Sequence, residues 1–365
     1  MRILFRYVFR EFCVPLAYCL TGFLSIYVLF ELFGVFSRMM EAKPGWVKIV
    51  TYFAGYLSPY FEWLAPACLM LAALYTMWGF CRHSELIAMR ASGVGFFAIV
   101  RPMLVVALLM AIFVGWVNES FVPRHAQWAK QFRAARFKQA DMDREDNLVY
   151  HNVKESRTWN VGAMINDNAT ALEDVSISED WPDGGRKRTI KAPRAEYLDG
   201  EWWLMQPVSF YFDVHGTEMP SPTPELEKMT FRRFPELNEI PRDFLVQNKS
   251  PEYYSTADRL RYISTHPNMS AKFRHEMEYD LWAQIASPLA CIIITLFAIP
   301  AGVATGRQSV FKGILGALGM FFAFYACTIG CMVISRLGYL PAIPAAFLPD
   351  VVFLAVGIVL FNRQR

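Results

Sequence analysis

The stretch SELIAMRASGVGFF, residues 84–97, is a short charged segment between two long apolar runs. The run before it ends near Phe80, and the next begins near Ala98. Between them lie the charged or titratable side chains of Arg82, His83, Glu85 and Arg90. Because a run of about 20 apolar residues is long enough to cross the hydrocarbon core of a bilayer, we expect this segment to be a helical loop joining two membrane spans.

Apolar runs of membrane length recur along the chain. There are six, at about 12–36, 49–80, 98–118, 281–304, 310–335 and 343–362. The second is too long for one straight crossing, and we expect Pro59 and Pro66 to break or kink its outer part. The first run is too long for a cleaved signal peptide and lacks a small-residue cleavage site. Three of the runs precede residue 119 and three follow residue 280, and six such runs argue against ordinary buried core helices.

The basic residues of the short loops predict the orientation in the membrane. One side carries ten of them: Arg2, Arg6, Arg10, Arg82, Arg90, Arg101, Arg307, Lys312, Arg363 and Arg365. The other side carries four: Arg38, Lys43, Lys48 and Arg336. We therefore expect both termini in the cytoplasm, with membrane parts at 1–118 and 281–365 and an exterior domain at 119–280.

The exterior domain has the pattern of a β structure. Alternating segments at 157–164, 171–178 and 208–214 predict strands. Asp199-Gly200 in AEYLDGEWWL predicts a two-residue hairpin turn. Several short, regularly spaced strands favour a sandwich or jelly roll. Helices are expected from Ser255 and, capped by Ser270, into the fourth span. All seven cysteines lie in or beside the spans, so this domain is expected to fold without disulfides.

One basic stretch stands out in the exterior domain. Over 119–280 we count 22 Lys and Arg against 27 Asp and Glu, so nucleic-acid binding is disfavoured. The exception is RHAQWAKQFRAARFK, residues 124–138, which contains no acid. Within it Lys130, Arg133 and Arg136 recur every three residues and are expected on one helical face. Two interpretations stay open: an anchor at lipid headgroups or a dedicated phosphate site.

Catalytic and cofactor motifs are missing from the sequence. It has no GxxxxGK[ST] loop, so we do not expect it to hydrolyse ATP. HEMEY lacks the second histidine of a zinc protease motif because Tyr279 stands there. Cys327 and Cys331 lie one helical turn apart, but helix packing explains them better than a metal pair. We expect no cofactor, no metal and no catalytic residue.

The whole chain resembles the LptF/LptG permeases of the lipopolysaccharide-export ABC transporter. The most specific segment is SELIAMRASGV at 84–94 between spans two and three. RYVFREF, KAPRAEYLDGEWWL and EYDLWAQIASPLACIIITLFAIP support it. The sixth span departs from the family pattern Trp-x-Pro-Asn with Phe347-Leu348-Pro349-Asp350. The resemblance implies an α-helical membrane protein with six transmembrane helices and an inserted all-β, jelly-roll-like periplasmic domain.

The resemblance also implies that the segment at 84–92 is the coupling helix, which transmits the movement of a partner ATPase to the membrane spans. The residues expected to serve it are Ser84, Glu85, Leu86, Ile87 and Arg90. Ser84 is expected to cap the helix and Glu85 to suit its positive end. Leu86, Ile87 and Val94 are expected to fill a groove in the ATPase.

Two further groups of site residues follow from the resemblance. Lipid headgroup contacts are expected at Arg38, Lys43, Lys130, Arg133 and Arg136. Close packing at a lateral gate is expected at Gly313, Gly316, Ala317 and Gly319 on span five, where small residues allow helices to approach. Glu31 near the outer end of span one indicates a headgroup contact that differs from the family's. Glu62 is an acid within a span and is a candidate for function by that position; the alternative is a location near the membrane interface.

The implied partners are a second LptF/LptG-type permease, an LptB-type ATPase dimer, an LptC-type single-span protein, an LptA-type bridge and lipopolysaccharide. The residues after span three favour the LptG type. The β domain would be the first station of the bridge and would accept acyl chains between its sheets. The implied location is the bacterial inner membrane. Three alternatives remain: an ABC permease for another lipid, a membrane scaffold that presents a β domain, and a membrane-embedded enzyme.

Overall fold

The computed structural model describes residues 2–137, 145–152, 155–165, 169–181, 185–213, 216–220, 230–247, 251–266, 269–307 and 310–363. The chain divides into two compact units. Unit 1 comprises 1–40, 45–129 and 270–365, and unit 2 comprises 41–44 and 130–269. Each unit is described by itself.

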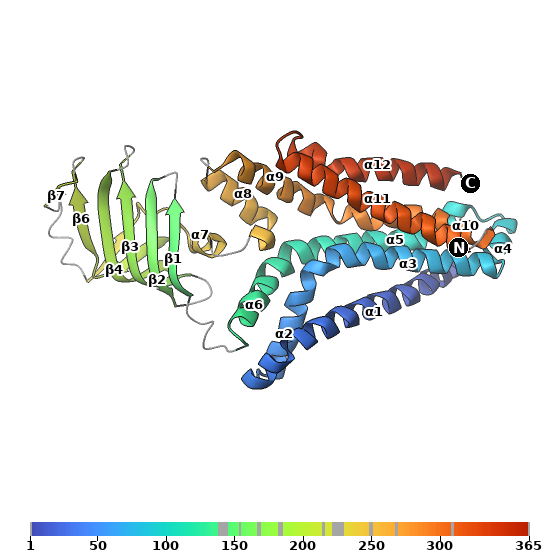
Figure 1. Cartoon of the computed structure of the whole chain (residues 1–365), viewed down its shortest axis with the longest axis horizontal. Helices are drawn as coiled ribbons and strands as arrows, with labels where there is room; N and C mark the ends of the chain where they lie inside the picture. The colour runs from blue at the N-terminus through green and yellow to red at the C-terminus, as the bar shows by residue number, and fades with distance from the viewer. Residues whose placement is uncertain are drawn as a thin grey trace. The chain divides into compact units, whose positions relative to one another are not determined.

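Unit 1 is a bundle of long helices (Figure 1). Its amino-terminal part consists of α1 (Arg2–Ala42), α2 (Trp46–Leu57), the 3-10 turn η1 (Ser58–Tyr60), α3 (Phe61–Arg82), α4 (Glu85–Ala91), α5 (Phe96–Trp116), the π-helical turn η2 (Val117–Phe121) and α6 (Val122–Ala134). Its carboxy-terminal part consists of α9 (Ala271–Ala286), α10 (Leu289–Arg307), α11 (Val310–Arg336) and α12 (Ala342–Asn362).

Within the described residues, five helical segments are long and apolar enough to cross a membrane, and α9 with α10 makes a sixth if the pair counts as one span. The pair is bent by 53° at its break. The sequence predicted a helix running on into the fourth span. The prediction of one uninterrupted helix is wrong, because Pro288 has no N–H to donate and disfavours helical geometry at Ser287.

The second predicted span contains the expected interruption. Pro59 lies in η1, which joins α2 to α3. Pro66 lies inside α3, which continues to Arg82 without a break. The predicted break is therefore confirmed at Pro59 only.

The core of unit 1 is the contact between α3 and α10. Gly302 of α10 faces α3 so closely that a Cβ atom there would lie 2.7 Å from the Cβ of Met77. A second close approach joins α2 to α6, where a Cβ on Gly55 would overlap the carbonyl oxygen of His125. Small residues at these two crossings let the backbones meet, as is usual where helices pack in lipid.

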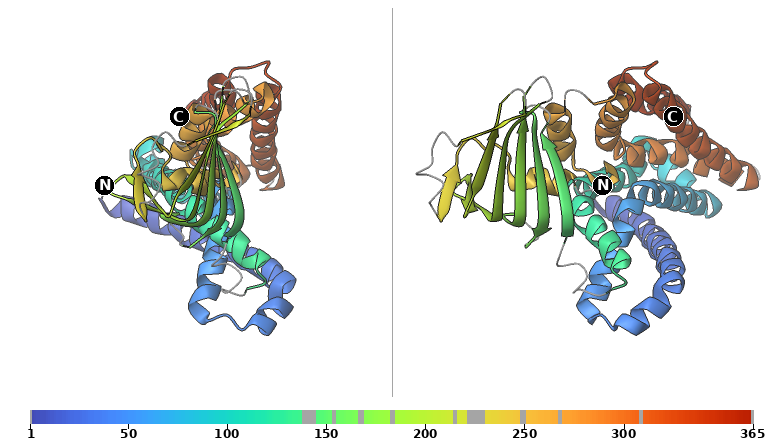
Figure 2. Two further views of the ribbon diagram at one scale, coloured as in Figure 1. Left: turned by 90° about the vertical axis from the view of Figure 1, so that its left-hand side faces the viewer. Right: turned by 60° about the vertical axis from the view of Figure 1, so that its left-hand side comes forward.

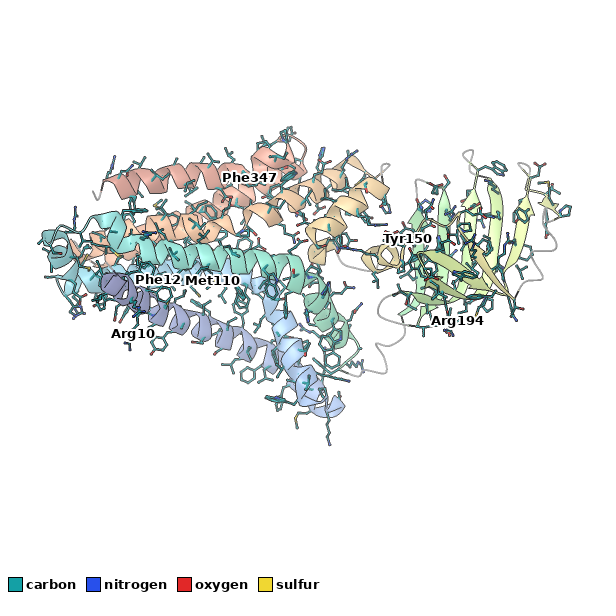
Figure 3. All side chains as sticks on the ribbon, turned by 180° about the vertical axis from the view of Figure 1, so that it is seen from behind. Arg10, Phe12, Met110, Tyr150, Arg194 and Phe347 are labelled. Carbon is teal, nitrogen blue, oxygen red and sulfur yellow. The ribbon has the colours of Figure 1, made fainter. Side chains whose placement is uncertain are left out.

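Helix α1 is the least enclosed long helix of unit 1. Its buried residues lie near its two ends: Val8, Phe12 and Leu16 at the amino end, and Glu31, Val35 and Met39 at the other. None of the residues from 17 to 30 is buried within this chain. Figure 1 shows α1 diverging from α3 along its length and meeting α2 at its carboxyl end, and Figure 3 labels Phe12 at the amino-terminal contact.

Unit 2 contains the predicted β domain. Its strands are β1 (Glu145–Asn152), β2 (Arg157–Met164), β3 (Ala171–Asp180), β4 (Arg186–Leu198), β5 (Glu201–Met205), β6 (Val208–Phe212), β7 (Glu218–Met219) and β8 (Phe231–Phe234). The helices are α7 (Pro241–Gln247), η5 (Pro251–Tyr253) and α8 (Thr256–Thr265). Ser270 caps α9 as predicted, accepting from the backbone N–H of Phe273. Ser255 likewise caps α8, the helix predicted there, and accepts from the backbone N–H of Asp258.

The eight described strands form one antiparallel sheet; six follow the order β1-β2-β3-β4-β5-β8, and off this path β6 pairs with β4 and β7 with β6. β4 pairs with β3 on one side, and its other side is shared by β6 and β5. Figure 2 shows the marked twist of this sheet. The all-β insert is confirmed, whereas among the described strands there is one continuous sheet and not the two that a jelly roll would give.

The predicted hairpin turn is confirmed at the junction of β4 and β5. Leu198 pairs with Glu201, and both turn residues have positive φ, at 53° for Asp199 and 87° for Gly200. The buried face of the sheet carries Trp159 and Trp202, whose rings lie 5.3 Å apart. Phe244 of α7 packs against both, and against Tyr150 of β1, which Figure 3 labels. α7 therefore covers this end of the core.

Candidate functional site

The segment at 84–92 forms the short helix α4, as predicted. Ser84 precedes it in the left-handed conformation, with φ 58°, and its side chain makes no capping hydrogen bond. The predicted serine cap is therefore wrong, because the turn that leaves α3 needs a left-handed residue where a cap needs extended backbone. At the other end Gly93 has φ 82°, a conformation that glycine adopts easily, and the chain turns there toward α5.

Glu85 is the first residue of α4, and its carboxylate is already engaged within the chain. The Tyr7 hydroxyl of α1 donates a hydrogen bond of 2.7 Å to Glu85 Oε2. The ring of Tyr7 also lies 5.9 Å from that of Phe80, in the last turn of α3. No local pattern predicts this contact, because the two residues are 78 positions apart.

The apolar residues of α4 divide between the chain's own core and its surface. Leu86 is 5% exposed and packs in the core of unit 1, so it is not available to a partner. Ile87 is 62% exposed. Val94 is half-buried against the same core. The predicted contribution of Leu86 to a partner groove is wrong, and Ile87, with the exposed Arg90, forms the outward face of α4.

The acid in the carboxy-terminal half of α1 is buried against α2. Glu31 is 5% exposed, and the Tyr52 hydroxyl of α2 donates a hydrogen bond of 2.5 Å to Glu31 Oε1. The rings of Tyr56 and Tyr60 lie nearby, tilted by 54° with their centroids 5.5 Å apart. Glu31 therefore joins α1 to α2. Arg38, one of the predicted headgroup residues, is exposed on the same helix.

The remaining predicted basic residues lie in unit 2. Lys43 is exposed and has φ 46°. The Lys130 ammonium lies 5.4 Å above the ring of Tyr253. Arg133 is exposed in the last turn of α6. Arg136 lies beyond the end of α6 with φ 51°, so the prediction that it shares a helical face with Lys130 and Arg133 is wrong.

The small residues predicted for the lateral gate lie on α11. A Cβ atom on Gly316 or Gly319 would meet no atom of this chain. Ala317, in contrast, is fully buried in the core of unit 1, and Gly313 is half-buried. Gly316 and Gly319 thus present an open surface, while Ala317 packs inward.

Two further acids lie on the helices of unit 1. Asp350 is 8% exposed on α12, which continues through Pro349. Glu62 lies in the first turn of α3, where a negative charge suits the helix dipole. Among the described residues, no three His, Cys, Asp or Glu side chains gather as a metal site.

The profile of the family described as "Lipopolysaccharide export system permease LptF/LptG" matches residues 6–363. The chain belongs to the LptF/LptG family. It is therefore a permease subunit of lipopolysaccharide export, a member of a transport family and not of an enzyme family, and a multi-pass protein of the inner membrane. No curated protein matches the sequence.

Proposed function

We propose that this LptF/LptG chain works as one half of a heterodimer that extracts lipopolysaccharide and passes it to a periplasmic bridge. A separate ATPase dimer would dock on α4, and the insert of unit 2 would receive the lipid. The observation that carries the proposal is the family match along 6–363. We favour the LptG type from the basic residues that follow α5.

The topology that we propose puts α4 and both termini in the cytoplasm and the β domain in the periplasm. It is supported by the excess of Lys and Arg in the loops on the side of α4. An LptC-type single-span protein and an LptA-type bridge would complete the assembly.

Docking of the ATPase is tested by reversing one charge on α4. Glu85→Lys should reduce the ATPase that copurifies with the full complex, because it removes an attraction and adds a repulsion at a buried contact. Glu252→Lys, the same reversal on an exposed residue of unit 2, is the control. A full complement of ATPase on the Glu85→Lys complex, with transport intact, would refute docking at α4.

The headgroup site that we propose combines Lys130 and Arg133, with Arg38, Lys43 and Arg136 as further contacts. Arginine can hold a phosphate with two hydrogen bonds, and lysine adds a point charge. Lys130 and Arg133 follow each other on the exposed side of α6, within reach of one phosphorylated headgroup.

The test compares bis-phosphorylated and dephosphorylated lipid A on the wild type and on Lys130→Ala/Arg133→Ala. Crosslinking of the phosphorylated lipid should fall selectively. Lys187→Ala is the matched control, because this lysine also lies over an aromatic ring of unit 2, 5.3 Å from that of Trp181. Equal loss of both lipids, or loss of neither, would leave these residues as an interfacial anchor. Binding of an unrelated lipid in place of lipid A would favour a permease for another substrate.

A further inference from the structure

The contact between Tyr7 and Glu85 joins the two segments of unit 1 that the proposed mechanism must connect. Its donor lies at the amino end of α1, and its acceptor is the first residue of α4. A hydroxyl that donates to a carboxylate over 2.7 Å makes a charge-assisted hydrogen bond, a stronger class than that between neutral groups. The contact is partly open to water, so its strength is moderate.

The surroundings of Tyr7 make this end of α1 a fixed point. Val8 and Phe12 next to it are fully buried in the core of unit 1. The Thr76 hydroxyl of α3 donates to the backbone carbonyl of Glu11 over 3.2 Å. α1 is thus attached to the last turns of α3 by packing, and to α4 by the hydroxyl of Tyr7.

Beyond this attachment α1 is a long continuous helix that connects the region of α4 to α2. It is one continuous helix of 41 residues, about 60 Å long at 1.5 Å per residue. No residue from 17 to 30 is fully buried, although Cys19, Leu20, Phe23 and Leu24 lie half-buried against the core of unit 1. At the far end Glu31 is bonded to Tyr52 of α2. A displacement of the amino end would therefore be carried along α1 to α2 and would disturb only partly buried contacts between the two ends.

We propose that Tyr7 is a positioning residue that holds Glu85 and joins α4 to the amino end of α1. Movement of α4 then reaches the first span directly, and not only through its covalent connection to α3. The inference rests on the proposed role of α4 in coupling, but the hydrogen bond itself is testable without any partner.

The first test measures hydrogen exchange over residues 84–95 of the full chain in nanodiscs. Tyr7→Phe keeps the ring against Phe80 and removes only the hydroxyl, so exchange of the α4 amides should rise about fivefold. Tyr18→Phe is the matched control: it is the same change on the same helix, at a side chain that is 73% exposed. Unchanged exchange in Tyr7→Phe, or an equal rise in Tyr18→Phe, would overturn the proposal.

A double-mutant comparison shows whether Tyr7 acts through Glu85. Glu85→Gln keeps a side-chain oxygen that can accept from Tyr7, so exchange should stay close to that of the wild type. Glu85→Ala removes the acceptor, and adding Tyr7→Phe to it should change exchange no further. Full additivity of Tyr7→Phe and Glu85→Ala would show that Tyr7 acts elsewhere and would overturn the proposal.

The second test uses the assembled transporter and measures lipopolysaccharide released per ATP hydrolysed. Tyr7→Phe should lower this ratio several-fold while the bound ATPase stays constant, since docking does not need the hydroxyl. A ratio equal to that of Tyr18→Phe would overturn the role in coupling. If the wild type itself released no lipopolysaccharide, the proposed function would fail, whereas the exchange result on Tyr7 would still stand.

Discussion

The two units of this LptF/LptG chain stabilise carboxylates in different ways. In unit 2 the partners are guanidinium groups: Arg157 binds Glu179 and Glu239 at 3.0 Å, and Arg188 binds Glu179 at 3.0 Å. In the helices of unit 1, Glu31 and Glu85 accept hydrogen bonds from Tyr52 and Tyr7. For the buried Glu31, a phenol satisfies the carboxylate without bringing a second charge out of water, which is costly in lipid.

This difference predicts how strongly the loss of one side chain destabilises each unit. The network of unit 2 is closed, because the Asn152 amide also donates to the Glu239 carboxylate and the Trp202 indole N–H donates to the Glu239 backbone carbonyl. Removing one member leaves a buried charge with too few partners. A tyrosine contact in unit 1 is one hydrogen bond with an uncharged donor between two helices, and Glu31 has further contacts besides it, so loss of one hydroxyl should loosen one contact and leave the unit folded.

The largest effect is expected from Arg157→Ala. It leaves Glu179 and Glu239 buried beside each other without their shared guanidinium, which should cost about 3–5 kcal/mol. Hydrogen exchange of β2 and β3 in the full chain measures this loss. Arg186→Ala removes an exposed partner of Asp180 and should cost less than about 1 kcal/mol. Equal costs would remove the distinction between the closed network and a surface pair.

Acid should weaken unit 2 by the same network. Burial alone would raise the pKa of Glu179, but the hydrogen bonds and charges of Arg188 and Arg157 outweigh it and hold that pKa below 4.5. A carboxyl whose pKa is lowered on folding stabilises the fold above its unfolded pKa, and this contribution is lost as the pH falls through the folded value.

We therefore expect exchange in β3 and β4 to stay level above about pH 5 and to rise below it. Glu179→Gln should lose stability at neutral pH and show a weaker rise in acid. A rise of the same size in Glu179→Gln would assign the acid sensitivity to other carboxyl groups.

The smallest effect is expected from Tyr52→Phe in unit 1. It removes one hydroxyl donor to Glu31 and keeps the ring, so it should cost about 1–3 kcal/mol. Thermal unfolding of the full chain in nanodiscs, with Tyr27→Phe as a control on α1, measures the loss. A cost as large as that of Arg157→Ala would contradict the view that an uncharged tyrosine donor contributes less than a shared guanidinium.

Much of the fold follows from local patterns. β2 coincides with the predicted strand at 157–164 because strict alternation matches one buried face. The Asp199-Gly200 turn and the serine caps of α8 and α9 are likewise properties of a few adjacent residues. The spans follow from apolar length alone.

The sequence-based predictions are wrong where the neighbouring structure overrides a local pattern. Ser84 has the right type for a cap, but the exit from α3 imposes a left-handed backbone on it. The spacing of Arg136 fits a helical face, but α6 ends two residues earlier. Pairings of residues distant in sequence, such as Tyr7 with Glu85 and Glu31 with Tyr52, leave no periodic trace and need the folded chain.

The distribution of cysteine makes the chain suitable for thiol labelling. All seven cysteines lie on the helices of unit 1 and are buried or half-buried. Leu198 ends β4 with 44% of its surface exposed, so Leu198→Cys would place a single accessible thiol on the β domain. A maleimide that cannot cross membranes would react with this thiol in cells with a permeabilised outer membrane if the domain is periplasmic. It would react only after lysis if the domain is cytoplasmic, so one reagent can decide the topology of the whole chain.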